Sequence, residues 1–153
     1  MLSGRLVHLI EANSASIVKR VITQIRRDPE LAHLSQLPER ELQEWGEHML
    51  EKFGDSLGTR TNEELTGYCQ STGQLRFEQG VPLHEAVRAL FLLKNKMIDF
   101  VLDQAATKTF LRVYEEEELE HRVDRFFDNL VCHMIRGYED AWRDPAHKAA
   151  FAR

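Results

Sequence analysis

The chain has 153 residues and a formal net charge of −5, with 29% charged and 42% hydrophobic residues. This composition is typical of one globular domain, and the negative charge disfavours nucleic acids and anionic membrane surfaces, both of which bind clustered Lys and Arg side chains. No N-terminal apolar run resembles a signal peptide, and Cys69 and Cys132 are spaced like isolated core residues of a reducing cytosol, so we expect a cytoplasmic protein.

Apolar residues recur with helical spacing along most of the chain, which predicts an all-α fold. The pattern predicts helices over about 2–27, 38–57, 61–79, 82–104 and 109–143, with a short turn at 29–37. We therefore expect a bundle of about five helices in one domain, residues 1–143, followed by a tail, residues 144–153.

The ends of these helices carry recognisable signals. The first helix is expected to end at Asp28, because a residue that precedes proline is disfavoured in helical conformation. Thr61 and Glu64 form a capping box at the start of the third helix. Gly80 is expected to end that helix, and Pro82 suits the first turn of the fourth.

The fourth helix is predicted to be the buried centre of the bundle, because its apolar face is unusually broad. On that face we place Leu83, Val87, Leu90, Phe91, Leu93, Met97, Ile98, Phe100 and Val101. A narrow polar strip formed by His84, Arg88, Asn95 and Asp99 lies opposite and is expected to face solvent or a polar interface.

The first and third helices carry small or polar residues where their periodicity predicts bulky ones. Asn13 and Ser16 lie in the first helix, and Thr72 and Gly73 lie in the third. Close backbone packing explains such residues most simply. A small polar cavity between the two helices is the alternative, and it makes these four residues candidates for a ligand site.

The fifth helix is predicted to be about 35 residues, roughly 50 Å, which exceeds the diameter of a bundle of this size. Part of it must then pack on a second copy or on another domain. Met134, Tyr138 and Trp142, near its end, are the predicted dimer or partner surface, and we expect the first helix to contribute to it.

Cofactor chemistry has few candidate ligands. His84 and His121 are the histidines considered for haem, but both are expected at polar positions. A di-metal bundle needs two Glu-x-x-His units, and the spacing occurs at Glu30/His33, in a turn, and at Glu118/His121, in a run of glutamates. No nucleophile motif or phosphate loop is present, so we expect no enzymatic activity and no cofactor.

The segment 75–94 carries an arginine, a short gap, a glycine and a leucine-rich helix that ends in a basic residue. The residues that follow this pattern are Arg76, Gly80, Leu83, Val87, Leu90, Leu93 and Lys94. The pattern resembles that of the N-terminal sensor domains of RsbR-type proteins, the RsbT co-antagonists of the bacterial stressosome. The resemblance extends more loosely over about residues 5–140.

This resemblance implies a non-haem, globin-like helical domain that forms a homodimer and passes a signal through its terminal helix to an output domain. In RsbR-type proteins the output is a STAS domain, which these 153 residues do not contain. The chain is therefore expected to be a fragment or a free-standing version that signals by binding a protein partner. The resemblance carries over no ligand residues.

We expect a non-enzymatic sensory or regulatory domain that responds to a small-molecule signal or a partner. Two alternatives stay open at this point: a haem- or metal-binding globin-like sensor, and a structural adaptor.

Overall fold

The computed structural model describes residues 4–53, 63–105 and 111–144. These residues form six α-helices and two short 3-10 helices, and no strand occurs among them, which confirms the all-α prediction. In chain order the elements are α1 (Gly4–Ala12), α2 (Ser14–Arg27), η1 (Pro29–Leu31), η2 (Leu34–Gln36), α3 (Glu39–Glu51), α5 (Glu63–Glu78), α6 (Leu83–Ala105) and α7 (Leu111–Arg143).

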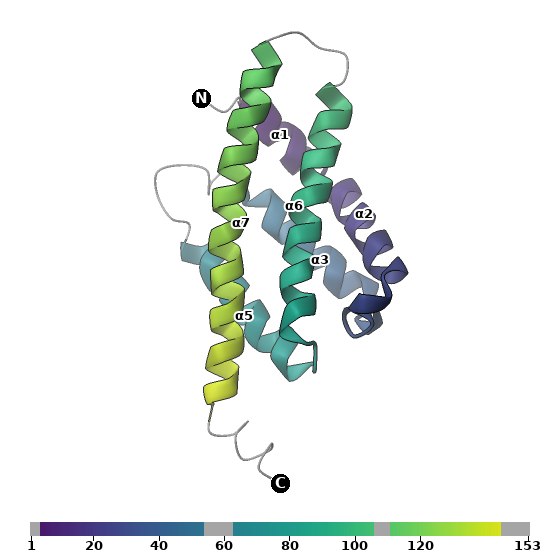
Figure 1. Ribbon diagram of the computed structural model, residues 1–153, viewed down its shortest axis with the longest axis vertical. Helices are drawn as coiled ribbons and strands as arrows, with labels where there is room; N and C mark the ends of the chain where they lie inside the picture. The colour runs from purple at the N-terminus through teal and green to yellow at the C-terminus, as the bar shows by residue number, and fades with distance from the viewer. Residues whose placement is uncertain (1–3, 54–62, 106–110, 145–153) are drawn as a thin grey trace.

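The two longest helices, α6 and α7, lie side by side and run in opposite directions (Figure 1). Helices α1 and α3 lie behind them, and α2 lies beside α6 and packs on both α3 and α6. Helix α5 packs along the C-terminal half of α7, in the most extensive contact between any two described elements (Figure 1). The core therefore lies between α6 and α7 in front and the N-terminal helices and α5 behind.

The predicted first helix is in fact two helices, because the chain breaks at Asn13. The side-chain Nδ2 of Asn13 donates a hydrogen bond to the carbonyl oxygen of Leu9 at 2.8 Å. The backbone N–H of Asn13 instead bonds the carbonyl of Ile10 at 3.2 Å. Asparagine side chains compete with backbone donors in this way, which ends α1 and lets α2 begin in a new direction.

The connection between α5 and α6 confirms the predicted roles of Gly80 and Pro82. Gly80 has a φ of +77°, a left-handed conformation that glycine adopts without steric cost. The N–H of Val81 bonds the carbonyl of Arg76 at 3.0 Å, and the N–H of Gly80 bonds that of Phe77 at 3.0 Å, as in a Schellman cap. The carbonyl of Pro82 then accepts from Glu85, in the first turn of α6.

Helix α6 is central, as predicted, but its buried face is shifted. Leu90, Leu93, Met97, Phe100 and Val101 are buried, and the predicted polar strip is exposed.

The prediction was wrong for two of the apolar side chains of α6, because Leu83 is 40% exposed and Phe91 is 38% exposed. Ala86 and Ala89 are buried instead, and so is the carboxylate of Glu85. The reason is that α6 packs against α2 on one side and α7 on the other, which leaves its outer face uncovered.

Helix α7 ends at Arg143 as predicted. Several predictions lie outside the described residues: the Thr61 cap, the beginning of α7 near Thr109, and the tail apart from Asp144. None of the helices built from the described residues has the length and apolar character needed to cross a membrane.

Candidate functional site

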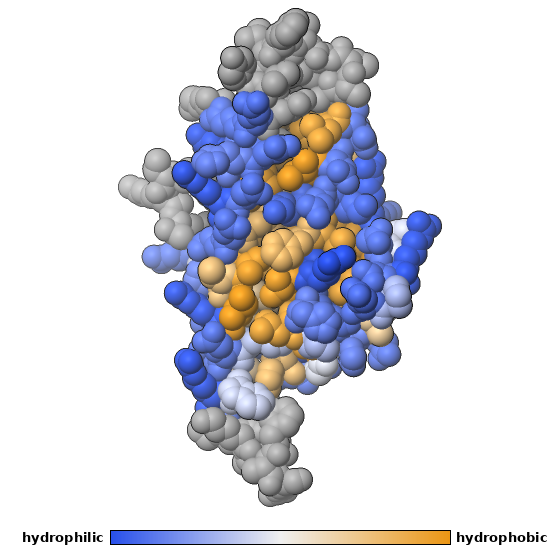
Figure 2. All heavy atoms as spheres, in the orientation of Figure 1, coloured by the Kyte–Doolittle hydropathy of each residue, from blue (hydrophilic) through white to orange (hydrophobic). Residues whose placement is uncertain are grey.

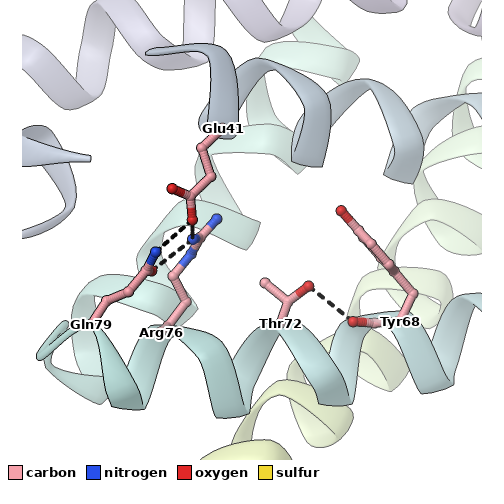
Figure 3. A network of polar contacts seen from close by, with 5 residues as sticks. All are labelled: Glu41, Tyr68, Thr72, Arg76 and Gln79. Atoms are coloured by element: carbon pink, nitrogen blue, oxygen red, sulfur yellow. Dashed lines mark hydrogen bonds and ion pairs between the residues drawn. The ribbon is translucent and has the colours of Figure 1, made fainter. Parts of the chain in front are cut away.

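A polar network joins α3 to the end of α5 around Arg76, whose side chain is almost fully buried (Figure 3). Nη1 of Arg76 donates to Oε1 of Glu41 at 2.6 Å and to Oε1 of Gln79 at 2.9 Å. Nε2 of Gln79 donates to the same Glu41 oxygen at 2.6 Å. One oxygen of Glu41 therefore accepts hydrogen bonds from Arg76, near the end of α5, and from Gln79, directly after it. The buried guanidinium is thus paired with a carboxylate, as its burial requires.

The turn after this network also contacts α7 and the 3-10 region. The hydroxyl of Tyr138, on α7, donates to the carbonyl of Val81 at 2.8 Å. Oε1 of the buried Glu85 accepts from the backbone N–H of His33 at 3.2 Å. Oε2 of Glu85 lies 3.2 Å from Nδ1 of His33 but accepts no hydrogen bond from the described residues. The α5–α6 turn is therefore tied to three other parts of the fold.

A surface hollow of about 280 Å³ lies beside this network, between α3 and α5. Its lining residues are Glu41, Glu44, Trp45, Tyr68, Ser71, Thr72, Leu75 and Arg76. Trp45 and Arg76 also line a narrow void that has no room for a water molecule and that is lined by Met134 of α7 as well. The polar side chains of the hollow can form hydrogen bonds or ion pairs with a polar molecule that also contacts its apolar side chains.

Helices α5 and α7 approach each other through two glycines. A Cβ added to Gly73 would meet the backbone of Met134 and would lie 3.1 Å from Cα of Gly137. A Cβ added to Gly137 would meet the carbonyl of Gln70 and would lie 2.9 Å from Cα of Gly73. The two backbones therefore touch directly, which leaves α5 and α7 little freedom to slide independently.

Burial governs the titration of three groups along α5 and α7. It raises the pKa of the Cys69 thiol to about 12 and raises the pKa of the Tyr138 hydroxyl well above its ordinary value. Burial also raises the pKa of Tyr68, although the nearby Arg76 guanidinium opposes the shift. All three groups are neutral at physiological pH, so they act there as hydrogen-bonding or apolar side chains.

These shifts predict a loss of stability in alkali. The folded chain keeps protons on Cys69 and Tyr138 that the unfolded chain releases near pH 8.5–10, so the unfolding free energy falls as the pH rises above about 9. Replacing Tyr138 with phenylalanine should make that decline shallower and cost about 1 kcal/mol at pH 7, through the lost hydrogen bond to Val81. Urea unfolding of both chains from pH 7 to 11 measures this, and parallel profiles would contradict it.

The four residues predicted to form a ligand cavity lie in different parts of the fold and make different contacts. Asn13 forms the break between α1 and α2, and Ser16 is exposed on α2. Thr72 lines the hollow and donates to the carbonyl of Tyr68 at 2.9 Å, whereas Gly73 faces α7. A cavity formed by all four stays a prediction, and only Thr72 belongs to the hollow described above.

The predicted dimer or partner residues divide between core and surface. Met134 and Tyr138 are buried within the chain itself, because α5 and the α5–α6 turn cover that side of α7, so they are not surface residues as predicted. Trp142 is 57% exposed, and its ring lies 6.2 Å from that of Phe77. Of the three residues, Trp142 is the one that presents an apolar surface.

Other exposed apolar side chains lie on the same pair of helices. Figure 2 shows apolar side chains in a strip where α6 and α7 lie side by side, with polar residues around it. Leu83, Phe91 and Leu102 of α6 are the exposed large apolar residues of that helix, and Val131 of α7 is half-buried.

The residues considered for haem or metal do not converge. His84 and His121 are exposed, and His33 contacts Glu85 rather than Glu30. In the part of the chain that the structure describes, no group of three or more His, Cys, Asp and Glu side chains is arranged to hold a metal ion.

Periodicity did not identify the main site residues. Arg76 was recognised in the sequence pattern but without a partner, and neither Glu41 nor Trp45 was identified as a site residue. The signal for Arg76 is its position: it falls on the buried side of α5 among Leu65, Cys69 and Thr72. A buried arginine requires a carboxylate partner, but the sequence does not indicate which one.

The fold and this site define an all-α domain in which polar side chains tie helices together around a small hollow. A family model for the RsbT co-antagonist protein RsbRD N-terminal domain matches residues 15–153. The chain therefore belongs to this family, whose members are non-catalytic sensor domains of stressosome co-antagonists. Searches of curated proteins and of solved structures found no match.

Proposed function

We propose that this chain is a cytoplasmic sensory domain that works as a homodimer and passes its signal through α7 to an output domain or a protein partner. Its family supports the sensory role, because such domains belong to stressosome co-antagonists, which bind partner proteins. The geometry supports the route through α7.

The close contact of α5 with α7 is the observation that carries this proposal. Helix α5 contributes Arg76 and Thr72 to the hollow on one side, and its Gly73 touches the backbone of α7 on another. A molecule that binds one arrangement of α3 and α5 more tightly than another shifts the population of arrangements. Because α5 and α7 share a backbone contact, α7 must respond to that shift.

The exposed apolar side chains of α6 and α7 are the surface that we assign to the dimer. Leu83, Phe91, Leu102 and Trp142 would each be removed from water in such a contact. Apolar and aromatic side chains at the centre of an interface supply most of its binding energy. Trp142 is the most exposed of them and lies at the end of the helix that would carry the signal.

Replacing Trp142 with glutamate tests this assignment. We expect the dimer to dissociate at least about tenfold more readily, because a charge would be buried in an apolar contact. Leu75→Glu is the matched control, since Leu75 is 43% exposed but lies on α5. Analytical ultracentrifugation of the two variants gives the dissociation constants, and equal constants would contradict the assignment.

A further inference from the structure

We propose that the hollow between α3 and α5 binds a small zwitterion, a free amino acid with an apolar side chain. This inference rests on the proposed sensory function and names the class of its signal. It follows from the size of the hollow and from the charges and donors around it.

The hollow has the size and shape of a site for a small metabolite. Its volume of about 280 Å³ is close to the lower end of the usual range for ligand pockets, roughly 300–1,000 Å³. Leu75 and the rings of Trp45 and Tyr68 give it apolar walls, while Ser71 and Thr72 add hydroxyl groups. An apolar side chain of a few carbons would be removed from water against Leu75.

The charges of the lining favour a ligand that carries both signs. Both hydrogen bonds that Arg76 donates within the described residues leave from Nη1, so Nε and Nη2 keep donors for a carboxylate. Glu41, which is paired with Arg76, and Glu44, which is paired with Arg40 at 2.9 Å, line the hollow as well, and their second oxygens can accept from an ammonium group. A simple anion would leave the carboxylate acceptors unused, and a simple cation would leave the Arg76 donors unused.

Three molecules that share one isobutyl group separate the charge requirements. L-leucine has both groups, 4-methylpentanoate lacks the ammonium, and 3-methylbutylamine lacks the carboxylate. We expect L-leucine, L-valine or L-methionine to raise the melting temperature of the full chain by roughly 5–10 °C at 100 times its dissociation constant. The two truncated analogues should bind at least about tenfold more weakly. Absence of binding by all three amino acids, or equal binding by the analogues, would overturn the proposal.

Two leucine substitutions on α5 locate the site. Ser71 is exposed and lines the hollow, so Ser71→Leu should fill it and abolish binding while the chain stays folded. Gly67→Leu is the control, because a Cβ at Gly67 meets nothing within 4 Å and Gly67 lies outside the lining. Unchanged binding by Ser71→Leu would place the ligand elsewhere and overturn the proposal.

The fluorescence of Trp45 gives a second readout. In a Trp142→Phe background Trp45 is the remaining tryptophan, so its emission should change with the amino acid and not with the analogues. Binding is measured without reference to dimer formation, so the ligand proposal and the proposed signalling route can fail separately.

Discussion

Replacing Gly137 with alanine is expected to lower the unfolding free energy by about 2–3 kcal/mol or more, as overpacking of a tight contact does. The added methyl group would meet the carbonyl of Gln70 and lie 2.9 Å from Cα of Gly73. Both neighbours are backbone atoms, so α5 and α7 would have to separate. Urea unfolding at pH 7 measures the loss, and Gly73→Leu should be at least as damaging for the same reason.

Gly67 provides the matched control for this prediction. It lies on α5 six residues before Gly73, and a Cβ there meets nothing within 4 Å. Gly67→Ala should therefore stabilise the chain by about 0.8–1 kcal/mol through helix propensity alone. If Gly137→Ala and Gly67→Ala changed stability in the same direction, the two helices would not be in direct backbone contact.

Replacing Glu41 with alanine is the second change with a large expected effect. It leaves the buried Arg76 guanidinium with Gln79 as its remaining described acceptor. Removal of one partner of a buried ion pair typically costs about 3–5 kcal/mol. Because the Glu41 side chain is 30% exposed, water can replace part of the interaction, and we expect about 2–3 kcal/mol. Urea unfolding gives this value directly.

A double variant distinguishes loss of the ion pair from loss of packing. Arg76→Met removes the buried charge and keeps much of the side-chain volume. Combined with Glu41→Ala, it should be less destabilising than the sum of the single changes by about 1–3 kcal/mol, because no unpaired charge is left behind. Strictly additive effects would show that the 2.6 Å contact contributes nothing specific to stability.

The features that the sequence predicted well depend on neighbours in the chain. Leu90, Leu93 and Met97 are buried because helical spacing places them on one face. Gly80 ends α5 because the left-handed conformation is needed within a few residues of the last helical turn. Both properties are local, so no knowledge of the rest of the fold was required.

The features that were missed depend on contacts between distant segments. Tyr138 was placed on an outer surface, but its hydroxyl bonds Val81 in the α5–α6 turn, far away in the sequence. Glu85 is buried because the 3-10 region brings the backbone N–H of His33 to it. Asn13 ends α1 because its side chain, rather than its backbone N–H, donates to the carbonyl of Leu9. A pattern of apolar residues does not predict such a bond.

The pattern of residues in segment 75–94 has a physical explanation in the structure. Arg76 joins α5 to α3, Gly80 turns the chain, and Lys94 pairs with Asp124 of α7 at 3.3 Å. The pattern thus marks the residues that fix α5 and α6 relative to α3 and α7. For that reason it identifies the region around the candidate site, although it specifies no ligand.

The native mass of the unmodified chain tests the proposed dimeric sensor most directly. Mass spectrometry under non-denaturing conditions, compared with the denatured mass, should give twice 17.8 kDa without the added mass of haem or metal. A mass of 17.8 kDa at every concentration would contradict the dimer through which α7 is proposed to signal. A retained haem or metal ion would instead make a cofactor the centre of the function.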